Sequence, residues 1–198
     1  MKNLIIILDP AHGEEVPGKR SPDGTHREYR WSRERIKVIK ESLERLGYEV
    51  VLTNTTDREI GLDKRRNFAT NYKKGQKKLL LSLHNDASAN TGWGKARGYS
   101  VWTTRGVTKS DECAEIILQQ FEKDFPEIKK RVFSPTQPHR DFEADFAVIR
   151  GADYMGVLIE WLFQDNQEDL VLLKDAELNS RYEASIVKAV ERINEVFN

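Results

Sequence analysis

Apolar positions gather in three runs along the chain, and each run ends directly in residues that can carry out chemistry. The runs, each with the residues that follow it, are 4–8 with Asp9-Pro10-Ala11-His12-Gly13, 79–83 with His84-Asn85-Asp86, and 155–159 with Glu160. Apolar runs bounded by turn signals are typical of buried strands in a parallel sheet. Open α/β sheets build their sites at the carboxyl ends of such strands, so we expect His12, His84 and Glu160 at one edge.

Between these runs the apolar spacing changes to that of helices. Ile36, Ile39 and Leu43 recur at helical spacing and predict a helix over 31–46, with Gly47 as a natural residue after its end. The same reasoning predicts helices over 62–74, 110–121 (capped by Ser110) and 176–196, strands over 48–52, 98–103 and 146–150, and loops over 13–27 and 131–145.

This alternation of strands and helices predicts an α/β fold. We expect a single domain over residues 1–198, built on a mostly parallel twisted sheet with helices on both faces and the site at the C-terminal strand edge. A chain of 198 residues suffices for one sizeable core, and neither an internal repeat nor a linker divides it.

Composition narrows the class of partner. Lys plus Arg and Asp plus Glu number 32 each, so overall charge favours neither nucleic acid nor an anionic membrane as a partner. Apolar residues make up 38% and charged residues 32%, as in soluble globular proteins. No apolar run is long enough to span a membrane, and no signal peptide precedes the first strand. Cys113 is the only cysteine, which excludes an internal disulfide, and its neighbours predict a small core residue.

Two imidazoles and one carboxylate are a ligand set of catalytic zinc sites. His12 and His84 supply the imidazoles, and Glu28, just before the first predicted helix, is the preferred carboxylate. His26 competes with Glu28, because an extended backbone places residues two apart on the same side. The alternatives are turn or capping histidines and a solvated glutamate favoured by the helix dipole. His139 is expected at the surface or facing a substrate.

Glu160 poses a separate question, because a carboxylate that leaves a buried apolar strand is costly to bury without a partner. It is either paired, in a buried salt bridge or at a helix N-terminus, or it is a general base beside a metal. Arg150, after the strand predicted over 146–150, is either a salt-bridge partner or a cation that stabilises a reaction's oxyanion.

Taken together, these motifs resemble those of the zinc-dependent N-acetylmuramoyl-L-alanine amidases, often called amidase type 3. In chain order they are Asp9-Pro10-Ala11-His12-Gly13, Glu28, Ser82-Leu83-His84-Asn85-Asp86, and Val157-Leu158-Ile159-Glu160-Trp161-Leu162-Phe163-Gln164-Asp165-Asn166. Residues 46–53 resemble the family's second strand and 57–69 its second helix, so the likeness covers nearly the whole chain. The departures are Ala11, where the family usually has glycine, Trp161 and Leu162, where it often has a small residue and glycine, and the loop 14–26.

The resemblance implies that His12, Glu28 and His84 bind Zn²⁺ and that Glu160 is the catalytic glutamate. It also implies a catalytic domain over 1–198 that hydrolyses the amide between the lactyl group of N-acetylmuramic acid and L-alanine in peptidoglycan. Zinc would acidify a water molecule and polarise the carbonyl group, and Glu160 would carry a proton from the water to the departing amine.

The implied partner is peptidoglycan or a muropeptide, with no nucleic acid and no membrane span. Trp93 and Trp102 either stack on sugar rings or pack in the protein, and residues 134–145 could form a groove wall. The implied place of action is the cell wall, reached by export, by release from a phage or after removal of a leader. We expect a monomer.

Two other classes of function stay open. A different zinc peptidase or amidohydrolase shares the ligand set and differs only in the bond that it cleaves. A non-catalytic wall-binding module on the same fold has no need of the Glu160 carboxylate. A nucleotide-binding domain is disfavoured, because no Gly-x-Gly-x-x-Gly or Gly-Lys-Ser/Thr loop follows the first strand.

Overall fold

The computed structural model describes residues 2–88, 91–133, 140–151 and 153–198. Within these ranges the strands are β1 (Ile5–Pro10), β2 (Val50–Leu52), β3 (Lys78–Asp86), β4 (Ser100–Thr103), β5 (Phe142–Glu143) and β6 (Met155–Phe163). The helices are α1 (Glu28–Arg45), α2 (Leu62–Asn71), α3 (Lys109–Asp124), α4 (Gln167–Lys174) and α5 (Ala176–Phe197).

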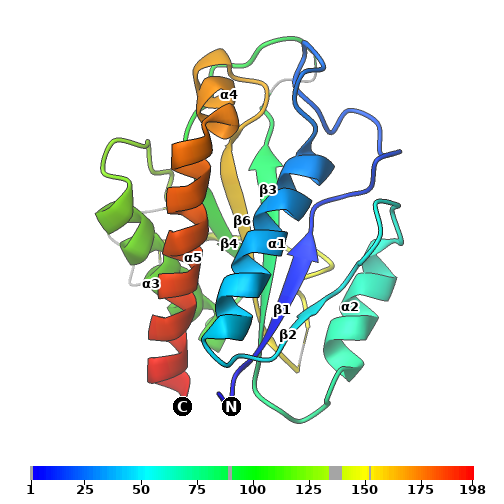
Figure 1. Cartoon of the computed structure of the whole chain (residues 1–198), viewed down its shortest axis with the longest axis vertical. Coiled ribbons are helices and arrows are strands. Elements are labelled where there is room, and N and C mark those ends of the chain that lie inside the picture. The colour runs from blue at the N-terminus through cyan, green and yellow to red at the C-terminus, as the bar shows by residue number, and fades with distance from the viewer. Residues whose placement is uncertain (1, 89–90, 134–139, 152) are drawn as a thin grey trace.

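The strands join one sheet in the order β2-β1-β3-β6-β4-β5. The first four are parallel, whereas β4 runs antiparallel to β6, and β5 runs parallel to β4. Asp9 lies opposite Ser82, and His84 lies opposite Glu160. The ends of β1, β3 and β6 therefore lie side by side at one edge of a mostly parallel sheet, as the three apolar runs predict (Figure 1).

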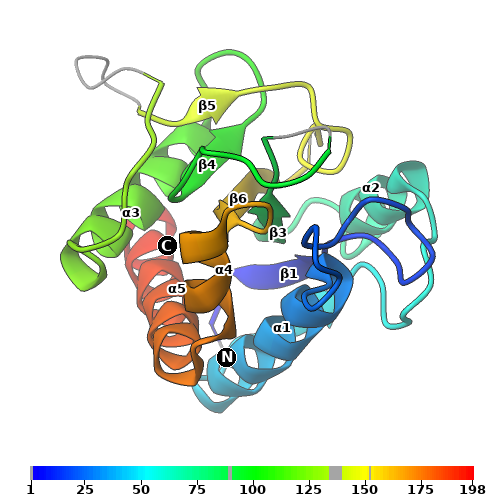
Figure 2. The same cartoon turned by 90° about the horizontal axis from the view of Figure 1, so that it is seen from above.

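Helices cover both faces of the sheet, because side chains alternate between the two faces along each strand. Ile6 of β1 belongs to an apolar cluster that includes residues of α1, α3 and α5. Its neighbour Ile7 belongs to a second cluster that includes Ala69 of α2. Figure 2 shows α1, α3 and α5 on one side of the sheet and α2 on the other. The predicted fold class is confirmed.

Residues 146–150, predicted as a strand, form a turn instead. Val148 and Ile149 are buried in the cluster that contains Ala69, and the Ile149 backbone lies against Gly156 of β6. This apolar segment therefore covers a face of the sheet without joining its hydrogen-bond ladder. The short strand β5 lies instead within residues 131–145, which were predicted as a loop.

Helix boundaries also differ from the prediction. α1 begins at Glu28, earlier than the predicted start at 31. The cap of α3 is Thr108 and not Ser110: the Thr108 hydroxyl oxygen accepts a hydrogen bond from the Ser110 N–H at 3.1 Å. The Ser110 hydroxyl oxygen instead accepts from the Gly156 N–H at 3.0 Å. The apolar pattern did not predict α4, which Asn166 caps.

Cys113 is fully buried in α3, as its helical neighbours predict. Its sulfur lies 3.6 Å from that of Met155. Burial raises the pKa of the Cys113 thiol, so this side chain contributes packing and no nucleophile.

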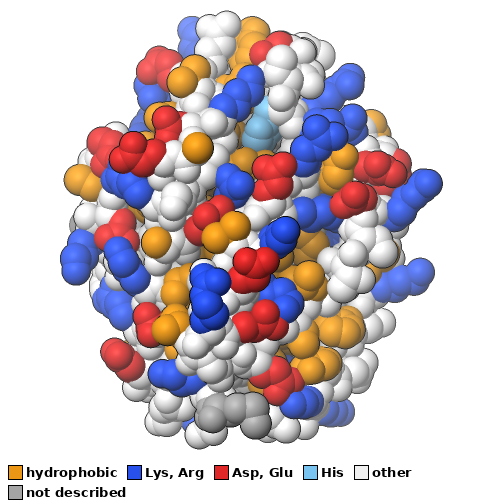
Figure 3. Space-filling model, in the orientation of Figure 1, with side chains coloured by type: hydrophobic (Ala, Val, Ile, Leu, Met, Phe, Trp, Pro, Cys, Tyr) orange, Lys and Arg blue, Asp and Glu red, His pale blue; other side chains and the backbone are white. Residues whose placement is uncertain are grey.

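The outer surface mixes charges of both signs. Figure 3 shows acidic and basic side chains interspersed over the face formed by α1 and α5. An ion pair of 2.7 Å joins Arg35 of α1 to Glu183 of α5 on this side. In the part of the chain that the structure describes, no helix combines the length and apolar character needed to cross a membrane.

Candidate metal centre

β1 ends in a tight turn that carries His12. The φ angle of His12 is +46°, which is sterically costly for a residue with a side chain. Arg33 donates to the carbonyl oxygens of Ala11 and His12, each at 2.9 Å. Arg65 donates to the same His12 oxygen at 3.2 Å and to the Pro10 oxygen. Two guanidinium groups therefore hold the strained turn and fix the direction of the imidazole.

Gly13 completes this turn, because its position has no room for a side chain. A Cβ atom there would lie 2.1 Å from the Glu59 backbone nitrogen. We expect Gly13→Ala to lower the free energy of unfolding by about 1–3 kcal/mol, as overpacking does, and, by displacing His12, to weaken the affinity for the zinc ion that the sequence predicts there. Urea denaturation and zinc titration measure the two effects.

The matched control is Gly106→Ala, at a loop glycine with a φ angle of +92° and no atom within 4 Å of an added Cβ. It introduces backbone strain without a steric clash, so zinc affinity is expected to stay unchanged. A Gly13→Ala variant with the stability and zinc affinity of the parent would contradict this account of the turn.

Glu28 is the first residue of α1, and its side chain is only 1% exposed. Its Oε1 lies 3.3 Å from His12 Nε2 and 2.8 Å from His84 Nδ1. Oε1 also accepts from the Asn85 N–H at 3.2 Å, and Oε2 accepts from Gln164 Nε2 at 3.0 Å. The entry of α1 thus places the carboxylate over the ends of β1 and β3.

His12, Glu28 and His84 form a group in which one ligand atom from each residue lies within 4.8 Å of the others. The two imidazole rings meet edge to face, with 4.9 Å between their centroids. Burial alone would raise the pKa of the Glu28 carboxyl, but hydrogen bonds with His12 and His84 bring it below its ordinary value. Two imidazoles with an ionised carboxylate fit the ligand preference of zinc at sites with an open fourth position.

Glu160 lies beside this group, paired in register with His84 across β3 and β6. Its Oε2 is buried and has no hydrogen-bond partner among the described residues. Burial raises the pKa of the Glu160 carboxyl well above its ordinary value, and the negative charges of Glu28 and Asp86 raise it further. Within the described ranges no salt bridge or helix N-terminus binds Glu160, so its carboxyl group is free to exchange protons.

The cations that act on Glu160 are Lys19 and Arg131, which lower the pKa of its carboxyl. Arg131 pairs with Asp86 at 2.8 Å between Nη1 and Oδ2. Arg150, the cation considered from the sequence, is exposed after the turn that packs on the first half of β6. Arg131, and not Arg150, is therefore the arginine whose charge acts on the Glu160 carboxyl.

His26, the competing ligand, lies outside the group of three. It is buried, and its Nε2 lies 2.8 Å from Asn85 Oδ1, while Asn85 Nδ2 donates to the Trp161 oxygen at 2.7 Å. Burial lowers the pKa of His26, which favours the neutral imidazole. It therefore supports the end of β3 and offers no ligand atom to the group. His139 lies outside the described residues.

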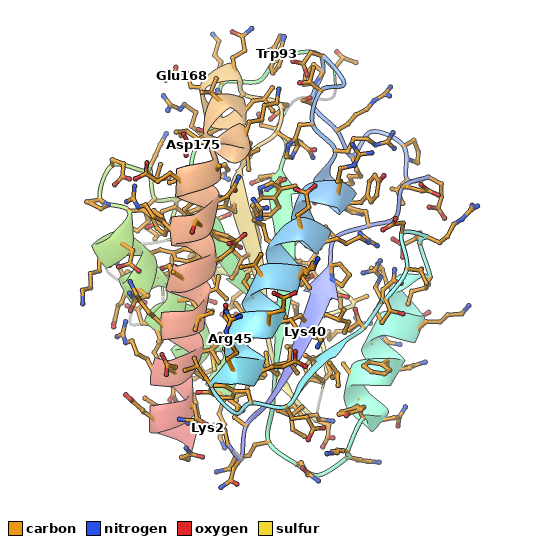
Figure 4. All side chains as sticks on the ribbon, in the orientation of Figure 1. Lys2, Lys40, Arg45, Trp93, Glu168 and Asp175 are labelled. Atoms are coloured by element: carbon orange, nitrogen blue, oxygen red, sulfur yellow. The ribbon has the colours of Figure 1, made fainter. Side chains whose placement is uncertain are left out.

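The two tryptophans considered for sugar stacking differ. Trp102 stacks on Phe142 with 4.7 Å between ring centroids, which is packing within the sheet edge. Trp93 is 40% exposed and lies at the end of the molecule that carries α4 (Figure 4). The Gly94 N–H next to it donates to the Asp165 oxygen at 2.7 Å, which ties this loop to the end of β6. Of the suggested wall 134–145, residues 134–139 lie outside the described ranges.

Several polar residues that hold the ligands in place were given no role from the sequence. Gln164 and Asn85 bind the Glu28 carboxylate, and Arg65 holds the His12 turn. Arg65 is 1% exposed and pairs with Asp9 at 3.1 Å. Asn85 and Gln164 share one signal, a polar residue at or near the end of an apolar run, which by itself does not distinguish a ligand from a residue that supports it; Arg65, within α2, carries no such signal.

Comparison with known proteins finds relatives that match nearly the whole chain. A family model described as N-acetylmuramoyl-L-alanine amidase matches residues 6–192. The N-acetylmuramoyl-L-alanine amidase AmiC of Neisseria meningitidis serogroup B is 27% identical over 229 residues, covering 95% of this chain and 52% of AmiC. The probable cell wall amidase LytH of Staphylococcus epidermidis is 24% identical, covering 97% of this chain and 59% of LytH. The chain thus spans little more than half the length of these relatives.

Solved structures share the fold. The crystal structure of N-acetylmuramoyl-L-alanine amidase from Clostridium difficile 630 superposes with a TM-score of 0.83 at 22% identity, covering 97% of both chains. The catalytic domain of CwlV, an amidase from Bacillus (Paenibacillus) polymyxa var. colistinus, superposes with a TM-score of 0.82 at 21% identity, covering 99% of both. Both matches extend over nearly the whole chain.

Proposed function

The chain belongs to the N-acetylmuramoyl-L-alanine amidase family, and from this premise we propose that residues 1–198 form a zinc-dependent catalytic domain. Its substrate is peptidoglycan or a muropeptide, and it cleaves the amide between the lactyl group of N-acetylmuramic acid and L-alanine. The observation that carries the proposal is a group of three potential zinc ligands beside Glu160, a half-buried residue whose Oε2 is buried without a hydrogen-bond partner among the described residues.

His12, Glu28 and His84 are the residues that hold Zn²⁺ in this proposal. The bound ion supplies a Lewis acid that polarises a carbonyl group and makes a water molecule more acidic. The chain's own part is to keep Glu28 ionised, which the hydrogen bonds with both histidines favour. Arg33 and Arg65 hold His12 in place before any substrate arrives.

Glu160 moves the proton. As general base it accepts a proton from the water that attacks the scissile carbonyl carbon. As general acid it then gives that proton to the amide nitrogen, so that the C–N bond breaks and L-alanine leaves with a free amino group. A carboxyl whose burial raises its pKa suits this work, because it holds the proton between the two steps.

The partner and place of action follow from the same proposal. The polymer approaches the C-terminal edge of the sheet, where the exposed Trp93 offers an aromatic ring to a sugar. The enzyme acts on the cell wall. The cavity of about 660 Å³ at the opposite edge of the sheet has no part in this proposal; Lys78, one of its lining residues, donates a hydrogen bond to Asp153 at 2.8 Å.

The test is to identify the bond that is cleaved. Purified peptidoglycan is digested, and new L-alanine amino termini are counted against new reducing sugar ends and other peptide termini. We expect new L-alanine termini alone. Other peptide termini would identify the protein as a zinc peptidase. Absence of any product from a folded, zinc-loaded protein would identify it as a binding module.

Zinc is also expected to stabilise the folded chain. A ligand that binds only the native state at 100 times its Kd adds about 2.7 kcal/mol, which for a chain of this size raises the Tm by roughly 5–10 °C. Differential scanning calorimetry of metal-depleted protein with and without zinc measures this shift. His12→Ala is the control and should lose most of it. Equal Tm values for the parent with and without zinc would contradict the metal site.

A further inference from the structure

Asp9, Ser82 and His84 form a row of hydrogen-bonded side chains that leads to the candidate metal centre. Asp9 of β1 lies opposite Ser82 of β3, and His84 follows Ser82 by two residues, so all three share one face of the sheet. The Ser82 hydroxyl lies 2.6 Å from Asp9 Oδ2, and His84 Nε2 lies 3.1 Å from the same Ser82 oxygen. Asp9 and Ser82 are 1% and 0% exposed, so solvent cannot replace either contact.

Asp9 acts as an acceptor in this row. Its Oδ1 accepts hydrogen bonds from Arg65 Nη1 at 3.1 Å and from the Thr53 hydroxyl. Its Oδ2 accepts a hydrogen bond from the Ser82 hydroxyl. An ionised carboxylate has no proton to give, so the single hydroxyl proton of Ser82 is directed to Asp9.

The orientation of the Ser82 hydroxyl determines which ring nitrogen of His84 carries a proton. Because the Ser82 proton is used on Asp9, the Ser82 oxygen faces His84 as an acceptor, and His84 Nε2 must carry a proton to bind it. In the metal-free chain Nδ1 shares its proton with Glu28; when a metal replaces that proton, the neutral ring keeps its other proton on Nε2 and offers the Nδ1 lone pair. That nitrogen lies 2.8 Å from Glu28 Oε1 and belongs to the group that could hold the metal.

We propose that Asp9 and Ser82 are positioning residues that set the tautomer of His84, leaving Nδ1 as the metal-binding nitrogen. This inference rests on the proposed zinc site. Hydrogen-bond partners of metal-binding histidines fix both the tautomer and the ring orientation, and their loss typically weakens metal binding by about 10–100-fold.

Arg65 connects this row to the other histidine. Besides Asp9, it donates to the backbone oxygens of Pro10 and His12. One buried ion pair therefore supports His84 through Ser82 and His12 through its backbone. Asp9→Asn would disturb the support of both histidines at once. A substitution of Ser82 removes only the support of His84, so Ser82 is the residue to test.

The experiment compares zinc affinity, by competition with a chromophoric chelator, for the parent, Ser82→Ala and Ser110→Ala. Ser110 is a matched control: it is buried and accepts one hydrogen bond, from the Gly156 N–H in the first half of β6. We expect Ser82→Ala to bind zinc about 10–100-fold more weakly and Ser110→Ala to match the parent. Thermal melts of the metal-free proteins confirm that each variant is folded.

A second measurement needs no variant. Long-range ¹H–¹⁵N spectra of the zinc-loaded parent are expected to show the His84 proton on Nε2, in slow exchange with solvent, and the metal on Nδ1. A proton on Nδ1, or a folded Ser82→Ala with the zinc affinity of the parent, would overturn the inference while leaving the zinc site intact. A parent protein that does not bind zinc would overturn the proposed function as well.

Discussion

Glu160→Gln is expected to lower kcat for amide hydrolysis by about 10²–10⁴-fold, the range that general acid–base catalysis contributes. Glutamine fills nearly the same volume but cannot take up the proton of the attacking water. Glu160 lies outside the group of three ligand residues, so zinc affinity should stay close to that of the parent. Initial rates on peptidoglycan and a zinc titration measure the two quantities on the same preparation.

The matched control for this substitution is Glu183→Gln. Glu183 is 8% exposed, and burial also raises the pKa of its carboxyl, but it lies on α5 and pairs with Arg35. We expect this variant to hydrolyse peptidoglycan at the parent's rate. If Glu160→Gln also kept the parent's rate, Glu160 would be a structural residue and another group would have to move the proton.

Glu28→Gln is expected to give the opposite result, a loss of zinc affinity with activity lost as its consequence. A four-ligand structural zinc site gains about 10–16 kcal/mol, or roughly 2.5–4 kcal/mol per ligand. Since each 1.4 kcal/mol is a factor of ten, losing one ligand should weaken binding roughly 100- to 1,000-fold. An amide oxygen is a poor zinc ligand, and the amide nitrogen would meet either the Asn85 N–H or Gln164 Nε2 as a fellow donor.

Glu34→Gln is the control on the same helix, because Glu34 is exposed and lies outside the ligand group. It should leave zinc affinity and rate unchanged. A Glu28→Gln variant that binds zinc as tightly as the parent would show that the carboxylate is not a ligand. His26, which is hydrogen-bonded to Asn85, would then have to be tested as the third ligand.

The sequence predicted the positions of those site residues that directly follow an apolar run. His84 and Glu160 stand at the ends of buried parallel strands, and such ends meet at one edge whatever the helices do, so their proximity could be predicted. Glu28 was harder, because it comes from a helix entry. Its place just before the first predicted helix, together with the family resemblance, favoured it over His26, and the position of the first turn of α1 decides which side chain reaches the histidines.

Other features could not be predicted, because they depend on three-dimensional packing. Val148 and Ile149 look like a strand, but they are buried by covering a sheet face, and apolar periodicity does not distinguish the two. The roles of Arg65 and Ser82 follow from hydrogen bonds across β1 and β3 that no local pattern encodes. The fold class could be predicted from the sequence, whereas the hydrogen bonds that hold the ligand residues became visible only in the three-dimensional structure.

The central claim is that one zinc ion, held by His12, Glu28 and His84, is required for cleavage of the amide. The most direct measurement is a titration of metal-depleted protein with zinc, with new L-alanine amino termini counted at each point. The account predicts no cleavage without metal and a linear rise that stops at one equivalent of zinc per chain. Full cleavage by the metal-depleted protein, or a rise that ignores this stoichiometry, would contradict it.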